Sequence, residues 1–245
     1  FIGEHRLVMR FMRAARLQRP PGAAYQQFFD PAVVLEHLDS WGALPQLSLV
    51  QLTRKLVTQA ELQCLCRSSD MASVWTTQIN TDAQGRTCWA YFRPKSMRGQ
   101  RDWHDAVPSD FSKPIALDGF APELASRDSL SAVVAEYRGR TAAMRAANAE
   151  RALDAPPALV LATKVRQQVF APLTSQRIAK MVKESLHAAG VADHYKAHSC
   201  RGAGSTAAAT SQPEESVRAR MGLGAKSTGV FQHHYKRVLR RRKAD

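Results

Sequence analysis

Cysteine is scarce in this sequence, and no apolar run is long. The 245 residues include four cysteines, which show neither CxxC pairs nor the density of a disulfide scaffold: Cys64, Cys66, Cys88 and Cys200. We expect these thiols to be reduced, as in proteins that work inside the cell. The longest apolar runs, such as residues 158–162, are far too short to span a bilayer. The sequence therefore predicts an intracellular protein that does not sit in a membrane.

Acidic residues are also few. Aspartate and glutamate number 21 against 35 lysines and arginines, which gives a formal net charge of +14 at pH 7. This balance favours a polyanionic partner, with nucleic acid first and an anionic membrane surface second. A merely basic protein without such a partner is the alternative that charge alone leaves open.

A proline-rich break separates a short N-terminal part from the rest. Residues 5–17 have their apolar side chains at helical spacing, and this pattern ends before Pro20-Pro21-Gly22. We expect residues 1–22 to be the end of one helical unit plus a linker, and residues 23–245 to be the main domain. The sequence opens in mid-helix pattern without methionine, as a fragment of a longer protein would.

Capping residues and helical spacing predict most of the main domain. Asp30 is an N-cap before a proline at the first helical position, which predicts a helix through residue 38. Further helices are predicted at 48–67, 127–149, 174–190 and 197–209. The pattern Ser211-Gln212-Pro213-Glu214 is typical of a capping box and predicts another helix start. A final helix should include Phe231 and Tyr235, before a basic tail.

The hydrophobic period changes between residues 74 and 92. Segments 74–79 and 87–92 are β-branched and aromatic, and turn-forming residues separate them, so they predict a β-hairpin. A short strand is expected from residue 158, after a loop at 150–157. The predicted fold class is therefore α+β, mainly helical, with a small antiparallel β-sheet.

Four segments carry candidate chemistry for cutting a phosphodiester without a metal. That reaction needs a nucleophile, cationic donors for the non-bridging oxygens and an acid for the leaving oxygen. Guanidinium groups suit the second role because their planar fork matches phosphate oxygens. The candidates are Arg67, Lys95, His198, Arg201 and Tyr235.

In order and spacing, these segments resemble the tyrosine recombinase (phage integrase) family. Arg67 follows an apolar helix with Asp70 three positions on, and Lys95 follows the predicted hairpin. Residues 198–201 match the family's His-x-x-Arg box, and residues 231–235 resemble its terminal nucleophile segment. Each motif alone is weak, but their order over roughly residues 30–239 is specific.

Several local segments are similar to recombinases of DIRS-type retrotransposons and related eukaryotic mobile elements. They are Arg19-Pro20-Pro21, Phe29-Asp30-Pro31, Leu47-Ser48-Leu49, residues 52–57 and residues 197–203. The last of these, Ala-His-Ser-Cys-Arg-Gly-Ala, is the strongest match.

The resemblance implies a fold, partners and a location. Residues 1–22 would be a remnant of the helical core-binding domain plus linker, and residues 23–245 the catalytic domain with a basic C-terminal tail. The partner would be double-stranded DNA, bound by a homotetramer, with neither cofactor nor metal. A protein of a eukaryotic mobile element would act in the nucleus, and otherwise in the cytoplasm.

The resemblance also implies a role for each candidate residue. Tyr235 would attack the scissile phosphate and form a 3′-phosphotyrosyl link, while Arg67 and Arg201 hold the non-bridging oxygens. Lys95 would protonate the leaving 5′ oxygen, and His198 would assist proton transfer or phosphate binding. We expect these side chains to converge on one basic cleft.

One position departs from the family pattern. The family has His or Trp after a glycine shortly before the nucleophile, whereas Met221-Gly222-Leu223-Gly224 places leucine there. Leucine cannot donate a hydrogen bond to a phosphate. A catalytically inactive DNA-binding relative is therefore an alternative, and an unrelated basic RNA-binding protein is another.

Some of the candidates have local competitors. Arg93 and Arg98 share the charged loop of Lys95, and Tyr195 competes with Tyr235 but precedes the His-x-x-Arg box. His194, His233 and His234 lack a carboxylate or thiol at ligand spacing, so a metal site is not expected.

Overall fold

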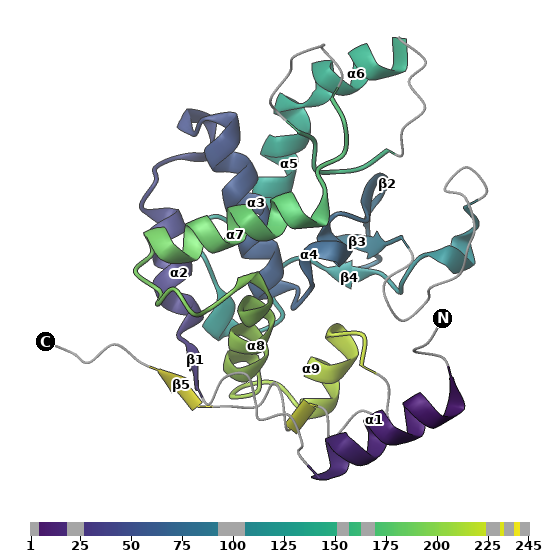
Figure 1. Cartoon of the computed structure of the whole chain (residues 1–245). Helices are drawn as coiled ribbons and strands as arrows, with labels where there is room; N and C mark the ends of the chain where they lie inside the picture. Colours follow the sequence, from purple (N-terminus) through teal and green to yellow (C-terminus); the bar gives the residue numbers. More distant parts are fainter. Residues whose placement is uncertain are drawn as a thin grey trace, which may run out of the picture.

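Helix α3 (Leu49–Gln63) runs through the middle of the structure, with α5 (Leu130–Arg140), α7 (Ser175–Ala188) and α8 (Ala197–Ala208) packed around it (Figure 1). The structure is a computed structural model that describes residues 5–18, 27–92, 106–150, 157–162, 170–223, 231–232 and 238–240. The remaining helices are α1 (Arg6–Gln18), α2 (Pro31–Asp39), α4 (Ser68–Met71), α6 (Ala142–Glu150) and α9 (Glu214–Arg220), with short 3-10 turns at Leu44–Gln46, Pro108–Asp110 and Pro122–Leu124.

Helix α3 is buried along most of its length. It begins after Ser48, whose hydroxyl accepts the backbone N–H of Gln51, while the Gln51 side chain accepts the backbone N–H of Ser48. This reciprocal cap satisfies two donors that the first turn leaves open. Every residue from 55 to 63 is buried. The predicted helix is thus confirmed over Leu49–Gln63, although it ends four residues before the predicted end at 67. It is the central element of the core.

The predicted hairpin is also confirmed and gains a third strand. Strands β2 (Val74–Thr81) and β3 (Thr87–Tyr91) pair antiparallel, and β4 (Ile115–Ala116) pairs antiparallel with the other edge of β3. Asp82 shapes the turn, since its side chain accepts the backbone N–H groups of Gln84 and Arg86. The predicted fold class, mainly helical with a small antiparallel sheet, is confirmed.

A second, two-stranded sheet joins the two ends of the main domain. Strand β1 (Gln27–Phe29) pairs parallel with β5 (Val238–Arg240). Within the predicted basic tail, residues 238–240 form a strand that the sequence does not predict, because pairing with a strand about two hundred positions away leaves no local sequence pattern. Only residues 231 and 232 of the predicted final helix are described, and both are helical.

Helix α8 packs closely because it carries two internal glycines. A Cβ atom added at Gly204 would lie 2.4 Å from the Leu62 carbonyl oxygen, and one added at Gly202 would lie 2.2 Å from the Phe28 ring. The small residues of the predicted 197–209 helix therefore let α8 contact the backbone of α3 on one side and β1 on another.

Two predicted elements differ in the structure. The helix predicted at 127–149 is broken at Thr141, where α5 ends; its hydroxyl donates to the Tyr137 carbonyl oxygen at 2.7 Å. Such back-bonding by threonine competes with the helix ladder. The strand predicted from 158 is reduced to the isolated bridges of Ala158 with Trp75 and Leu161 with Pro172.

The predicted capping box at residues 211–214 is wrong. Helix α9 begins at Glu214 with Pro213 at the N-cap, and no side chain caps it. The Ser211 hydroxyl instead donates to the Glu123 carboxylate at 2.6 Å. A tertiary acceptor therefore replaces the local one that the sequence pattern suggested.

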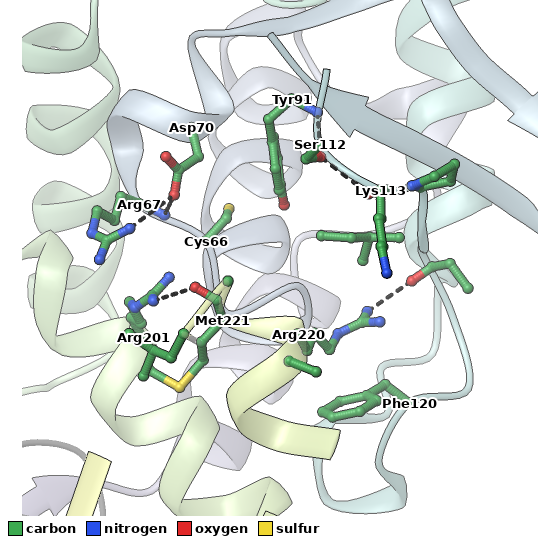
Figure 2. Close-up of a pocket in the computed structure, with 16 residues that line it drawn as sticks. Cys66, Arg67, Asp70, Tyr91, Ser112, Lys113, Phe120, Arg201, Arg220 and Met221 are labelled. Atoms are coloured by element: carbon green, nitrogen blue, oxygen red, sulfur yellow. Dashed lines mark hydrogen bonds and ion pairs between the residues drawn. The ribbon is translucent and has the colours of Figure 1, made fainter. Parts of the chain in front are cut away.

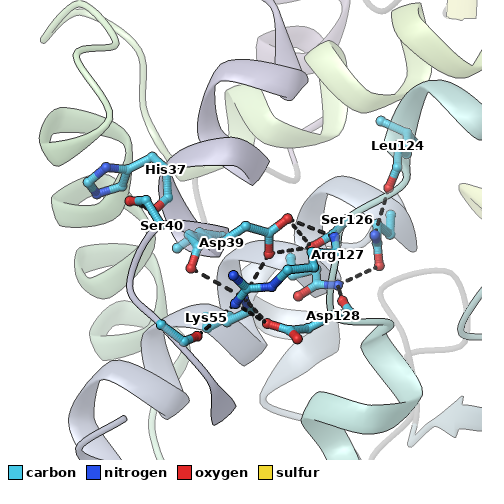
Figure 3. A network of polar contacts seen from close by, with 12 residues as sticks. His37, Asp39, Ser40, Lys55, Leu124, Ser126, Arg127 and Asp128 are labelled. Atoms are coloured by element: carbon cyan, nitrogen blue, oxygen red, sulfur yellow. Dashed lines mark hydrogen bonds and ion pairs between the residues drawn. The ribbon is translucent and has the colours of Figure 1, made fainter. Parts of the chain in front are cut away.

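A buried lysine of α3 binds the neighbouring elements on the side of the helix away from the sheet. The Lys55 ammonium donates to Asp39 at 2.8 Å, to Asp128 at 2.7 Å and to the Leu38 carbonyl oxygen at 3.2 Å (Figure 3). Burial alone would raise the pKa of Asp39, but hydrogen bonds from Lys55, Arg127 and Ser126 outweigh it and lower that pKa. The network joins α2, α3 and the segment before α5.

Helix α1 confirms the helix predicted at 5–17. Leu7 and Phe11 on its apolar face are 66% and 71% exposed. Residues 19–26, which include the predicted linker, lie outside the described residues, so the division at residue 22 stays a prediction. No helix in the described ranges has the length and apolar character that crossing a membrane requires.

We predict that Gly204→Ala destabilises the protein while Gly139→Ala does not. The added methyl at 204 collides with the backbone of α3, which should cost about 1–3 kcal/mol of unfolding free energy. Gly139 in α5 has open space around it, so alanine there should raise the free energy of unfolding by about 0.5–1 kcal/mol. Urea unfolding of both variants checks this, and equal stability of the two would contradict the packing described for α8.

Candidate functional site

Arg67 sits at a turn that the end of α3 creates. Leu65, just before it, has a φ of +53°, a left-handed conformation that is uncommon for a side chain other than glycine. Asp70 in α4 accepts the backbone N–H of Arg67 at 3.0 Å and forms an ion pair with its guanidinium at 3.6 Å. The Arg67 side chain is 28% exposed. Asp70 thus orients Arg67, and the guanidinium reaches solvent.

Arg201 is almost completely buried, at 1% exposure. Its guanidinium donates to the Leu65 carbonyl oxygen at 2.6 Å and to the Met221 carbonyl oxygen at 2.5 Å. Both acceptors are neutral, so these two bonds fix the guanidinium without cancelling its charge. The strained backbone of Leu65 is what aims its carbonyl at Arg201.

Arg67 and Arg201 line one cavity of about 660 Å³, here called the site cavity. In Figure 2 the two arginines lie on one side of it and Lys113 on the other. Its walls come from the end of α3, the sheet and the end of α9, and the further lining residues include Cys66, Asp70, Tyr91, Ser112, Phe120, Arg220 and Leu223. Arginines far apart in the sequence are therefore brought to one concave surface.

Two other potential nucleophiles in the site cavity are held in their neutral forms. Burial raises the pKa of the Cys66 thiol well above its usual value, and neighbouring Cys64 raises it further. Burial likewise raises the pKa of the Tyr91 hydroxyl, with Cys66 as the next contribution. Ionising either side chain for attack therefore costs more free energy than ionising an exposed thiol or phenol, which disfavours both as the nucleophile.

Arg220 also lines the site cavity but is engaged in structure. Its guanidinium donates to the Gln63 carbonyl oxygen at 3.0 Å and the Ala116 carbonyl oxygen at 2.7 Å, and it lies 4.3 Å from the centre of the Phe120 ring. These contacts tie α9 to the end of α3 and to β4. Arg220 therefore shapes the cavity floor.

Lys113 is a cavity residue that sequence reasoning missed. It is exposed and lies two residues before β4. The connection between β3 and β4 holds both Lys95 and Lys113, and Lys95 lies outside the described residues. A third strand after the hairpin would have pointed to Lys113. This strand, β4, has only two residues, which are too few to leave a pattern in the sequence.

Leu223 lines the site cavity at the position where the resemblance predicts His or Trp. Its backbone N–H donates to the Arg218 carbonyl oxygen at 2.9 Å, and the preceding Gly222 has a φ of +66°. The turn after α9 thus places an apolar side chain in the wall of the cavity that the two arginines line.

His198 does not line the site cavity. It is exposed and lines a neighbouring groove of about 590 Å³ with Arg67, Lys180, Lys183 and Lys196, here called the lysine groove. Arg67 lines both hollows. Arg201 thus lines one hollow, His198 lines the adjoining one, and Arg67 lines both. Because Lys95 and Tyr235 lie outside the described residues, the convergence of all five candidates stays a prediction.

Tyr235 lies outside the described residues, but its described neighbours are anchored. Phe231 is fully buried in a small cluster with Leu65 and Met221, and residues 238–240 form β5. The competing Tyr195 is also buried, and its hydroxyl donates to the Gln27 carbonyl oxygen at 3.0 Å. Tyr195 lines neither hollow and instead holds β1.

The candidate metal histidines find no support in the described ranges. His194 packs its ring against Tyr195, with centroids 4.1 Å apart, and His233 and His234 lie outside the described residues. Within the described residues, no cluster of three or more His, Cys, Asp or Glu side chains could hold a metal ion.

A buried carboxyl group lies beneath the Arg67 turn. Glu61 is fully buried and accepts a hydrogen bond from the Ser68 hydroxyl at 2.6 Å. Burial raises the pKa of Glu61 to about 8; the Ser68 hydrogen bond opposes this rise, and the charge of Asp70 adds to it. Glu61 is therefore largely neutral in the folded protein at pH 7.

We predict that Glu61→Gln removes a pH dependence of stability. The folded pKa of about 8 exceeds the value of 4.5 expected in the unfolded chain, so wild type loses stability as pH rises from 4.5 to 8. The glutamine keeps the Ser68 bond without ionising, and should be more stable by on the order of 4 kcal/mol at pH 8 and equally stable below pH 4.5. Urea unfolding across this range measures it, with the exposed Glu36→Gln as control; parallel curves for Glu61→Gln and wild type would contradict the burial of a carboxyl group.

Comparison with known proteins finds likeness in structure only. No protein-family model and no curated protein matches the sequence. A lambda integrase dimer bound to a COC′ core site superposes with a TM-score of 0.54 and 11% identity, over 90% of this chain and 51% of that one. XerH site-specific recombinase bound to difH substrate, in a pre-cleavage complex, superposes with a TM-score of 0.56 and 13% identity, over 86% of this chain and 51% of that one.

A lambda integrase tetramer bound to a Holliday junction gives a TM-score of 0.54 and 10% identity, over 97% of this chain and 59% of that one. The chain thus spans between half and three fifths of the length of these proteins. Because the sequence identity is this low, the likeness shows a shared fold only. The chain has the mainly helical fold with a small antiparallel sheet that is found in the catalytic domains of these tyrosine recombinases.

Proposed function

We propose that this protein cuts and rejoins DNA strands through a 3′-phosphotyrosyl intermediate formed by Tyr235. The observation that carries the proposal is the meeting of Arg67 and Arg201 in one cavity of a recombinase-like fold. Two fixed guanidinium groups can stabilise the charge that builds on the non-bridging oxygens as the phosphate is attacked. The phosphotyrosyl link conserves the bond energy, so the reaction needs neither cofactor nor metal.

The proton for the leaving 5′ oxygen would come from a lysine of the β3–β4 connection. Lys95 is the residue that the family resemblance favours, and Lys113 is the one that lines the site cavity opposite the arginines. His198 lines the lysine groove next to Arg67. From there it would bind the phosphate or assist proton transfer.

The proposed substrate is double-stranded DNA, bound by a homotetramer that pairs two duplexes. The formal charge of +14 supports a polyanionic partner. The structural neighbours were solved as a dimer on a core site and a tetramer on a Holliday junction. Residues 52–57 and 197–203 further support descent from a DIRS-type or related mobile element, with action in the nucleus of a eukaryotic host.

A second candidate function is DNA binding without catalysis. Leu223 favours it, because this apolar side chain lines the site cavity where the family has a hydrogen-bond donor. Loss of one such donor weakens stabilisation of the transition state by roughly 3 kcal/mol in other enzymes. The two functions differ in one product, the covalent protein–DNA adduct.

We predict a covalent adduct on nicked suicide duplexes that is lost in Tyr235→Phe. The nick lets the short cleaved strand diffuse away, so the phosphotyrosyl link accumulates; phenylalanine lacks the attacking oxygen. Denaturing gels of wild type and variant, with duplexes from a randomised pool, check this. Tyr195→Phe is the matched control and should keep the adduct. Salt-sensitive binding without an adduct would favour the inactive relative.

We predict that a 5′-bridging sulfur identifies the general acid. A thiolate leaves without a proton, so the variant that lacks the acid should cleave ordinary DNA at least about 100-fold more slowly and recover on sulfur-bridged DNA. Lys95→Ala and Lys113→Ala are to be compared in single-turnover cleavage. If both variants cleave both substrates at the wild-type rate, neither lysine is the general acid.

A further inference from the structure

The lysine groove is a hollow of about 590 Å³ beside the site cavity, and the proposed chemistry uses only its edge. It lies between α7 and the starts of α4 and α8, next to Arg67. Its cations come from separate segments: Lys180 and Lys183 from α7, Lys196 from the residue before α8, and His198 from the first turn of α8. The fold therefore gathers positive charge that the sequence scatters.

Helix α7 lines the groove along one face, on which Gln176, Lys180 and Lys183 are polar. Gln176, Ala179, Lys180 and Lys183 all line it, at positions that share one face of a helix. The opposite face, with Ile178, Val182 and Leu186, is buried in the core. From residue 176 to residue 183 this face rises by about 10 Å, which corresponds to about three base-pair steps of rise along a DNA helix axis.

The lining of the groove suits phosphate rather than a base or an apolar ligand. Ser69 and Ser175 supply hydroxyl groups beside the lysines, and no carboxylate is among the described residues that line the groove. Among the described residues, no ion pair links Lys180, Lys183 or Lys196 to an acidic side chain. Lysines bind phosphate as point charges on flexible stems, which positions a backbone without reading its sequence.

We propose that the lysine groove binds the phosphates that flank the scissile phosphate on the same DNA strand, with Arg67 at the boundary between them. Arg67 lines both hollows, so a strand entering the site cavity must pass it to reach Lys180 and Lys183. The groove thereby fixes the register of the strand while the site cavity holds the reacting phosphate. The assignment of a scissile phosphate rests on the proposed function; the binding of backbone phosphates does not.

The test compares two charge-matched double variants of the full chain. Lys180→Ala with Lys183→Ala removes two groove cations, whereas Arg138→Ala with Arg177→Ala removes two exposed cations that line neither hollow. Fluorescence anisotropy with a labelled duplex over a salt series gives the slope of log affinity against log salt. Each lost phosphate contact should lower the magnitude of that slope by about 0.9.

We predict a fall of about 1.8 in the slope for the groove variant and little change for the control. Equal slopes for the two variants would overturn the proposal. Stronger competition by single-stranded RNA than by duplex would also overturn it, in favour of an RNA site. A groove-dependent slope without a covalent adduct on suicide duplexes would leave phosphate binding intact and count against the proposed catalysis alone.

Discussion

The buried guanidinium of Arg201 is the contact on which the architecture of the site depends. It bridges the carbonyl of Leu65, at the end of α3, and that of Met221, at the end of α9. A buried charge without such partners would destabilise the fold by several kcal/mol, so the two turns are held where the bonds require them. The left-handed backbone of Leu65 costs roughly 1–2 kcal/mol, which the charge-assisted bond offsets. One side chain thereby positions Arg67, Leu223 and the cavity between them.

The rest of the core supports that contact by making α3 rigid. Lys55 fixes one side of the helix to α2 and to the segment before α5 through two carboxylates and a carbonyl. Gly204 brings α8 against the backbone near its end, which sets the depth at which Arg201 enters. Polar residues buried along α3 are thus used to fix its neighbours, since a purely apolar helix surface would allow them to slide.

The two hollows divide electrostatic work between buried and exposed cations. Arg201 is fixed in a low-dielectric wall, where its charge acts strongly on a group held nearby. The lysines of the groove are exposed and screened by salt, so in the proposed reaction they would contribute attraction and register more than stabilisation of a transition state. Arg67, half-buried and oriented by Asp70, stands between the two environments.

The sequence by itself determined most of the helices and the hairpin, because caps, helical spacing and alternation are local. Ser48, Asp30 and residues 74–92 carry such patterns, and the structure follows them. The tertiary structure alone decided that Ser211 bonds to Glu123 and that β1 pairs with β5. It also decided that Lys113 faces the arginines and that His198 lies in a separate groove. These features depend on contacts between residues distant in the chain, and no local pattern encodes which distant partner a side chain or strand will meet.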